Sequence, residues 1–259
     1  MLPCLLLLAV LVVGGCRAIT DLVPALATDP PPWSTRLAEH LECEGEPTGI
    51  GAGSDPQNGG GGAHGDTPEQ ALEVFVAGEA RFYGFMPLDG WVVVDRTAHW
   101  ALAAHLVEGR PRALASFSDA PSDDAQLGAW AQWQVAACDA SEFAADAPLS
   151  LDAIIWSDDQ GRVPTTRVLE AAGCSWRRLE VDGRAFVRDE RGSFDQDRLL
   201  DTFGAAMPVP GDAEPTPYHE GERRIWFAAD GRSAYVGTGD RAERWPRAVD
   251  DDTTVTDCN

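Results

Sequence analysis

The sequence predicts an α+β fold that is mainly antiparallel β-sheet, with a few short helices, stapled by disulfides. One strongly capped helix begins near Thr67, and short strand-like runs separated by turn-formers follow it. This order is typical of an antiparallel sheet with a helix packed on one face. The chain is 44% hydrophobic and holds nine Trp, so it can fill a core. An even set of cysteines in the body of the chain predicts the disulfides. These are Cys43, Cys138, Cys174 and Cys258.

Residues 1–15 have the pattern of an export signal. They carry no charge, and the apolar run from Leu5 to Val13 ends at Gly14-Gly15-Cys16. A secretory signal has roughly 7–15 apolar residues before small residues at the cut, whereas a spanning helix needs roughly 18 or more. No Lys or Arg precedes the run, which is unusual for such a signal. Such a signal can be an ordinary cleaved one, with Cys16 merely near the cut, or one that ends in attachment of a lipid to Cys16.

The order Val13-Gly14-Gly15-Cys16 resembles the bacterial lipobox. The resemblance implies cleavage after Gly15, lipidation of Cys16 with palmitate-type chains, and a place on the outer face of the cell membrane. Residues 16–33, which end in Asp29-Pro30-Pro31-Pro32, would then form a stiff, lipid-anchored spacer.

The charge of the chain limits the classes of partner that it can bind. The net charge is −22, and all twenty basic residues are arginine. Phosphate backbones require a cationic patch, so this charge argues against nucleic acid. It would also repel anionic headgroups, so we expect membrane contact through the lipid anchor alone. Solubility explains the acidity most simply, and a surface for cations or basic partners is the alternative.

Residues 34–66 and 67–147 form the first half of the predicted body. In 34–66, Ser34 can cap a short helix that reaches about Glu42, and a flexible Gly-rich loop follows from residue 49. In 67–147, Thr67 is the expected N-cap, Pro68 the first helical residue and Gln70 the end of a capping box. The helix should run for about 13 residues and be followed by strands at 90–96, 98–107, 112–117 and 130–138.

Residues 148–259 form a predicted C-terminal β-rich lobe, which meets the first near Pro148. We expect a strand at 153–156, a turn at 157–162 and a short helix from Thr165 or Thr166 to Gly173. Strands at 177–181 and 184–188 should form a hairpin about Asp182-Gly183. A proline-rich loop at 207–217 precedes strands at 223–227, 233–237 and 241–245.

Four body cysteines in an exported chain predict two disulfides, with three possible connectivities. We favour Cys138 with Cys174, which closes a loop within one half. Cys43 would then pair with Cys258, and so long a loop constrains the unfolded chain most. No cysteine pair has the spacing of a zinc knuckle or a redox motif.

The sequence offers little catalytic or metal chemistry, so we expect no metal, no cofactor and no identifiable catalytic residue. His99 and His105 are six residues apart, roughly 20 Å along a strand, which is too far to share a metal. No Gly-x-Ser-x-Gly motif occurs. The acidic clusters lack the spacing of a calcium loop. Trp130 and Trp133 fit a core better than an exposed platform for glycan or peptide.

Several segments resemble an uncharacterised family of exported actinobacterial lipoproteins, over roughly residues 135–258. They are Cys138-Asp139-x-x-Glu142-Phe143, Trp156-x-Asp158-x-x-Gly161, Val163-Pro164-Thr165, Cys174-x-Trp176 and Glu243-Arg244-Trp245-Pro246-Arg247. The resemblance also supports pairing Cys138 with Cys174, since both lie inside the shared pattern. It implies no activity or ligand.

The sequence therefore predicts a cell-envelope lipoprotein that is more consistent with a non-enzymatic binding module than with an enzyme. The expected partner is an envelope protein, peptide or glycan held through one face. The first alternative is an extracytoplasmic hydrolase with a dispersed active site. A solute-binding component of a transporter is the second, although that class usually needs a longer chain.

Overall fold

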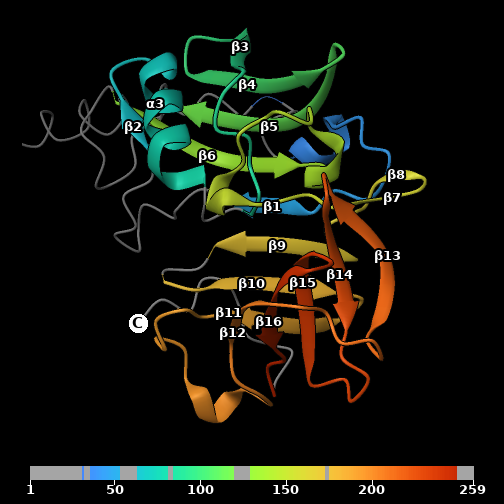
Figure 1. The fold of residues 1–259 in the computed structure, drawn as a ribbon. Coiled ribbons are helices and arrows are strands. Elements are labelled where there is room, and N and C mark those ends of the chain that lie inside the picture. Colours follow the sequence, from blue (N-terminus) through green and yellow to red (C-terminus); the bar gives the residue numbers. More distant parts are fainter. Residues whose placement is uncertain are drawn as a thin grey trace, which may run out of the picture.

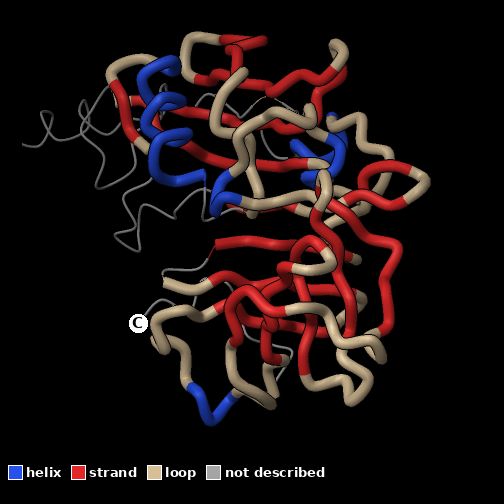
Figure 2. The backbone as a smooth tube through the Cα atoms, viewed as in Figure 1, coloured by secondary structure: helices blue, strands red, loops and turns tan. Residues whose placement is uncertain are grey.

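The computed structural model describes residues 31, 36–52, 63–80, 84–119, 129–172 and 175–249. These residues form a mostly antiparallel β protein with few and short helices (Figures 1 and 2). The first sheet has the order β1-β6-β5-β4-β3, and β2 also pairs with β6. Its strands are β1 (Gly49–Ala52), β2 (His64–Gly65), β3 (Trp91–Arg96), β4 (Trp100–Val107), β5 (Arg110–Ser118) and β6 (Trp130–Ala137).

Helical segments cover both faces of the first sheet. Helix α3 (Pro68–Val74) continues as a π-helical turn, η4 (Phe75–Glu79), and packs on one face (Figure 1). The 3-10 helix η2 (Leu37–His40) packs on the other. Alternation along β5 divides the core, because successive side chains of a strand point to opposite faces. Ala113, Ala115 and Phe117 join the cluster of Phe75 on the α3 side, whereas Leu114 joins Leu37.

The C-terminal part holds two further sheets, drawn below the first in Figure 1. One has the order β11-β10-β9, and the other the order β12-β16-β15-β14-β13-β7-β8. The three-stranded sheet comprises β9 (Val168–Ala172), β10 (Arg177–Val181) and β11 (Arg184–Arg188). The seven-stranded sheet comprises β7 (Ser157–Asp158), β8 (Gly161–Arg162), β12 (Gly204–Met207), β13 (Glu214–Glu220), β14 (Arg223–Phe227), β15 (Ser233–Thr238) and β16 (Arg241–Pro246). Short 3-10 turns are η6 (Ala140–Glu142), η7 (Ser150–Asp152) and η8 (Gln196–Arg198).

The two C-terminal sheets share one core, which contains Trp156, Phe186, Ile225 and Trp245. Polar contacts also join these sheets to the first half, beside apolar packing by Leu149 and Ile155. Asp139, which is 5% exposed, accepts hydrogen bonds from the backbone N–H and the hydroxyl of Thr165. Arg162 donates to the backbone carbonyl of Phe143. Since these contacts join segments on either side of Pro148, they fix how the two parts meet.

The predicted helix start is confirmed, since the Thr67 hydroxyl accepts a hydrogen bond from the Gln70 N–H. The strands of 90–138 and the hairpin about Asp182 are also found. Two other predictions are wrong. The expected strand at 153–156 makes only an isolated bridge at Ile154, and the expected helix after Thr165 is strand β9. The turn expected at 157–162 is found as the tight β7–β8 hairpin. Strand β13 begins inside the predicted proline-rich loop and takes up its last four residues, 214–217. Among the described residues no helix has the length and apolar character needed to cross a bilayer.

The favoured disulfide pairing is wrong, because Cys43 bonds to Cys138. The chain leaving Cys43 enters β1, which runs antiparallel to β6, and the Thr48 N–H donates to the Ala137 carbonyl. This pairing of β1 and β6 carries Cys43 to the end of β6, where Cys138 follows. Neither the Cys138–Cys174 nor the Cys43–Cys258 bond can then form. Cys174 and Cys258 themselves lie outside the described residues.

Candidate functional site

An apolar groove of about 570 Å³ lies beside helix α3. The capped helix supplies one wall, and the segment before β3 and the turn η7 supply the other. Apolar side chains dominate, and Glu73, Asp89 and Ser150 add polar groups. The lining residues are Leu72, Glu73, Val76, Ala77, Gly78, Leu88, Asp89, Gly90, Trp91, Ser150 and Leu151. An apolar cavity with a few polar groups is the usual form of a binding site.

Unusual backbone conformations gather around this groove. Leu151 has φ 60° and Asp152 has φ 45°, in the left-handed region that branched or bulky side chains rarely adopt. The opposite wall includes the π-helical turn η4, a form found frequently at functional sites. Such strain costs of order 1–3 kcal/mol per residue and persists where surrounding structure imposes it. The outliers therefore favour the groove as a functional surface.

The edge strand β3 starts in the groove, because Trp91 is both its first residue and a lining residue. β3 ends the strand order of the first sheet, so within the described residues nothing pairs with its outer side. Val92 and Val94 are 47% and 48% exposed. A bulge near Val94 and the charges of Asp95 and Arg96 limit uncontrolled pairing at the far end. The groove end of β3 lacks charges of this kind on the strand itself.

His105 lies directly behind the groove. Its ring approaches Gly90 and makes edge-to-face contacts with Trp91 and Phe143. Burial lowers the pKa of His105, and the nearby Asp89 carboxylate only partly opposes this. Its buried Nδ1 has no hydrogen-bond partner in the described part of the chain. A neutral imidazole that no carboxylate orients does not form the base of a catalytic triad, so we assign His105 to packing.

The other histidine singled out in the sequence, His99, stands apart from His105 at the opposite end of β4. Its Nδ1 lies 2.9 Å from Oδ1 of Asp119. Sequence reasoning also placed Trp130 and Trp133 in the core, and only Trp130 is buried. Trp133 is 42% exposed and packs edge-to-face on Trp100. Neither Trp133 nor the His99–Asp119 pair lines the groove.

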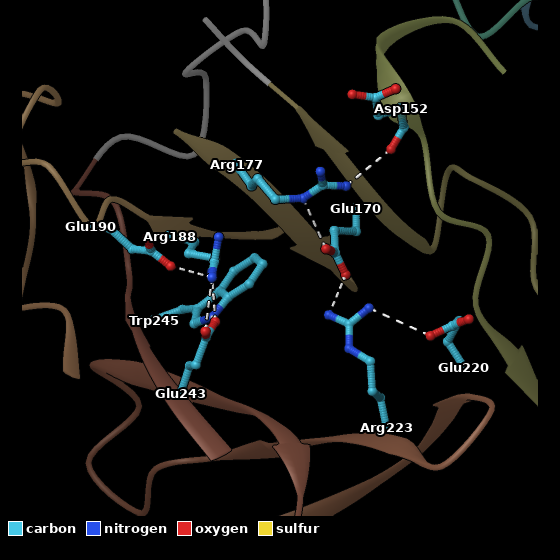
Figure 3. A network of polar contacts seen from close by, with 9 residues as sticks. All are labelled: Asp152, Glu170, Arg177, Arg188, Glu190, Glu220, Arg223, Glu243 and Trp245. Carbon is cyan, nitrogen blue, oxygen red and sulfur yellow. Dashed lines mark hydrogen bonds and ion pairs between the residues drawn. The ribbon is translucent and has the colours of Figure 1, made fainter. Parts of the chain in front are cut away.

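A second cavity, of about 400 Å³, lies between the two C-terminal sheets. Ion pairs build its walls (Figure 3). Glu170 on β9 is 2% exposed and joins two arginines, which approach from opposite sides. Its Oε1 accepts from Nε of Arg177 at 3.0 Å, and its Oε2 from Nη2 of Arg223 at 2.9 Å. One buried carboxylate thus holds guanidinium groups from β10 and β14 in fixed positions.

The second half of this network centres on Glu243 of β16. Both carboxylate oxygens accept from Arg188, at 2.7 and 2.9 Å, and the indole N–H of Trp245 also donates to Glu243. Burial by itself would raise the pKa of Glu243, but the hydrogen bonds from Arg188 and Trp245 outweigh it and lower the pKa. The hydrogen bond with Glu243 raises the pKa of Arg188 in turn. Both groups are therefore ionised across the physiological range.

Sequence reasoning missed this arginine cavity altogether. Its residues come from six strands in two separate stretches of the chain, β9 to β11 and β14 to β16, so no local motif marks it. The run of charged residues on β10, Arg177, Arg178 and Glu180, is a weak local hint, since only Arg177 of the three lines the cavity.

Of the predicted site residues, only Cys43 and Cys138 lie within the described ranges; Cys16, Cys174 and Cys258 lie outside them. Cys43 and Cys138 also fall within 4.8 Å of a Glu142 carboxylate oxygen, a grouping that could hold a metal ion if the thiols were free. The disulfide uses both sulfurs, so they are not thiolate ligands here.

No protein-family model matches the chain, and neither a curated protein nor a solved structure shows significant similarity to it. Kinship with the exported actinobacterial family stays a prediction.

Proposed function

We propose that this chain is a cell-envelope lipoprotein of the exported actinobacterial family it resembles, anchored through Cys16, that acts as a non-enzymatic binding module. Its partner is an envelope protein or peptide that adds an extended segment to the outer side of β3. One apolar side chain of that segment enters the groove beside Trp91. The hydrolase alternative draws no support from His105, which lacks an orienting carboxylate among the described residues.

The open edge of β3 is the observation that carries this proposal. An edge strand offers unpaired N–H and C=O groups to a second strand, and flanking pockets supply specificity. Here the edge carries two exposed valines and leads directly into an apolar groove. The Cys43–Cys138 disulfide supports an oxidising compartment, as the export signal does.

The binding test compares two exposed valines. Val92→Lys places a charge on the edge of β3, whereas Val249→Lys changes a valine of similar exposure in the C-terminal part (47% against 52%). We expect Val92→Lys to reduce recovery of a specific envelope partner at least tenfold, and Val249→Lys to leave it unchanged. With wild type, partner binding should also slow hydrogen exchange at β3 amides. Equal recovery by both variants, or no slowing at β3, would refute the proposal.

Anchoring is tested separately. Mass spectrometry of the mature N-terminal peptide should find diacylglycerol on Cys16, and Cys16→Ser should release the protein from the membrane. An unmodified Cys16 would disprove the anchor and leave the binding test unaffected.

A further inference from the structure

The lining of the arginine cavity has a charge opposite to that of the molecule as a whole. The chain carries a net charge of −22. The cavity is lined by four arginines and two glutamates, an excess of two positive charges. Its lining residues are Glu170, Arg177, Arg188, Arg223, Val236, Gly237, Thr238, Arg241, Glu243 and Trp245. Two more carboxylates, Glu190 and Glu220, pair with Arg188 and Arg223 from outside this lining.

The two outer carboxylates hold the arginines less firmly than the inner ones. Their side chains are 54% and 43% exposed, against 2% for Glu170 and 29% for Glu243. Exposed ion pairs are screened by water and contribute little. An incoming anion can therefore compete with Glu190 and Glu220 while Glu170 and Glu243 keep the guanidinium groups in place.

Arg241 completes the set. It is exposed, lines the cavity at the start of β16, and its guanidinium has no carboxylate partner within the described ranges. The position of its backbone is fixed, because β15 and β16 approach closely at Gly237. A Cβ at Gly237 would lie 2.4 Å from the Arg241 carbonyl oxygen. The cavity thus combines three positioned guanidinium groups with a fourth that is unengaged.

We propose that this cavity binds the oxyanion of a small ligand, a carboxylate or a phosphate. Planar guanidinium groups match both oxyanions through paired N–H donors. Arg241 makes the first contact, and Arg177, Arg188 and Arg223 form the fixed wall. Val236 and Trp245 also line the cavity, but both are almost fully buried, so the ligand contacts are chiefly polar. This site is independent of β3, so either proposal can fail while the other stands.

The test uses inorganic phosphate and citrate as probes, titrated calorimetrically at ionic strength held constant with sodium chloride. We expect saturable binding of at least one probe; which of them binds more tightly identifies the preferred oxyanion. Arg241→Gln should weaken it about tenfold, as loss of one charge-assisted contact does. Because the Arg241 guanidinium forms no ion pair with any described residue, the melting temperature of the variant should stay that of wild type.

The matched control is Arg110→Gln, which removes an exposed arginine of the first sheet whose ion pair with Glu42 is long, at 4.0 Å. It should leave binding unchanged. If neither probe binds more tightly than chloride, or if both variants lose affinity for the probe equally, the cavity is only a structural ion-pair network and the proposal is wrong.

Discussion

Removing the Cys43–Cys138 disulfide should destabilise the protein strongly. The bond closes a loop with a sequence separation of 95. The chain-entropy model gives about 4.7 kcal/mol for a loop of that length, and measured losses are commonly smaller, about 2–5 kcal/mol. For a domain of this size each kcal/mol lowers the melting temperature by roughly 2–4 °C. We therefore expect the double variant Cys43→Ala/Cys138→Ala to melt roughly 10 °C below wild type.

Two measurements check this expectation. Thermal unfolding of the double variant gives the magnitude, and peptide mapping of wild type without reductant gives the connectivity. The map should contain Cys43 linked to Cys138; if the cysteine count does mean two disulfides, Cys174 and Cys258 are then left for each other. A peptide linking Cys138 to Cys174, or a double variant that melts with wild type, would refute the reasoning.

Three further changes test the packing. Glu170→Gln should lower the free energy of unfolding in urea by about 2–3 kcal/mol, because two guanidinium groups lose a buried partner. Glu190→Gln, at an exposed pair, should lower it by less than about 0.5 kcal/mol, and equal losses in the two variants would contradict the network. His105→Phe should flatten the pH dependence of melting. Because the folded pKa of His105 is lowered, the unfolded chain binds the proton first, so wild-type stability falls as the pH drops below about 6.5. A variant as pH-sensitive as wild type would exclude that role. Thr67→Ala should cost about 1 kcal/mol through loss of the helix cap, and Thr67→Ser should restore most of it.

The elements that were predictable from sequence are those whose signals are local. The cap at Thr67 and the turn at Asp182-Gly183 depend on neighbouring residues, so they could be read directly. Strand β9 could not be predicted from local signals. Leu169, Glu170 and the alanines after them favour a helix, yet pairing with β10 and burial of Glu170 between two arginines override that preference.

Strand β13 shows a second limit of sequence reasoning. Pro215 and Pro217 indicated a loop, since proline cannot donate to a central ladder. β13 tolerates them because its contact with β7 is confined to the pair His219–Ser157, so it behaves as an edge strand over most of its length. The prediction of the disulfide failed for a related reason. The bond depends on β1 pairing with β6 across 80 residues or more of the chain, which no spacing of cysteines reveals.

Stability alone does not account for the arginine cavity. Apolar residues of similar volume often stabilise a buried site as well as an ion-pair network does, or better. The core directly beside the cavity, around Trp156 and Ile225, is built in that apolar way. Within the lining four arginines meet two glutamates, and only the exposed Glu190 and Glu220 outside the lining bring the network to balance. In a chain with more than twice as many acidic as basic residues, a lining in which arginines outnumber carboxylates, balanced only by exposed groups that an anion can displace, favours a role in holding an anion.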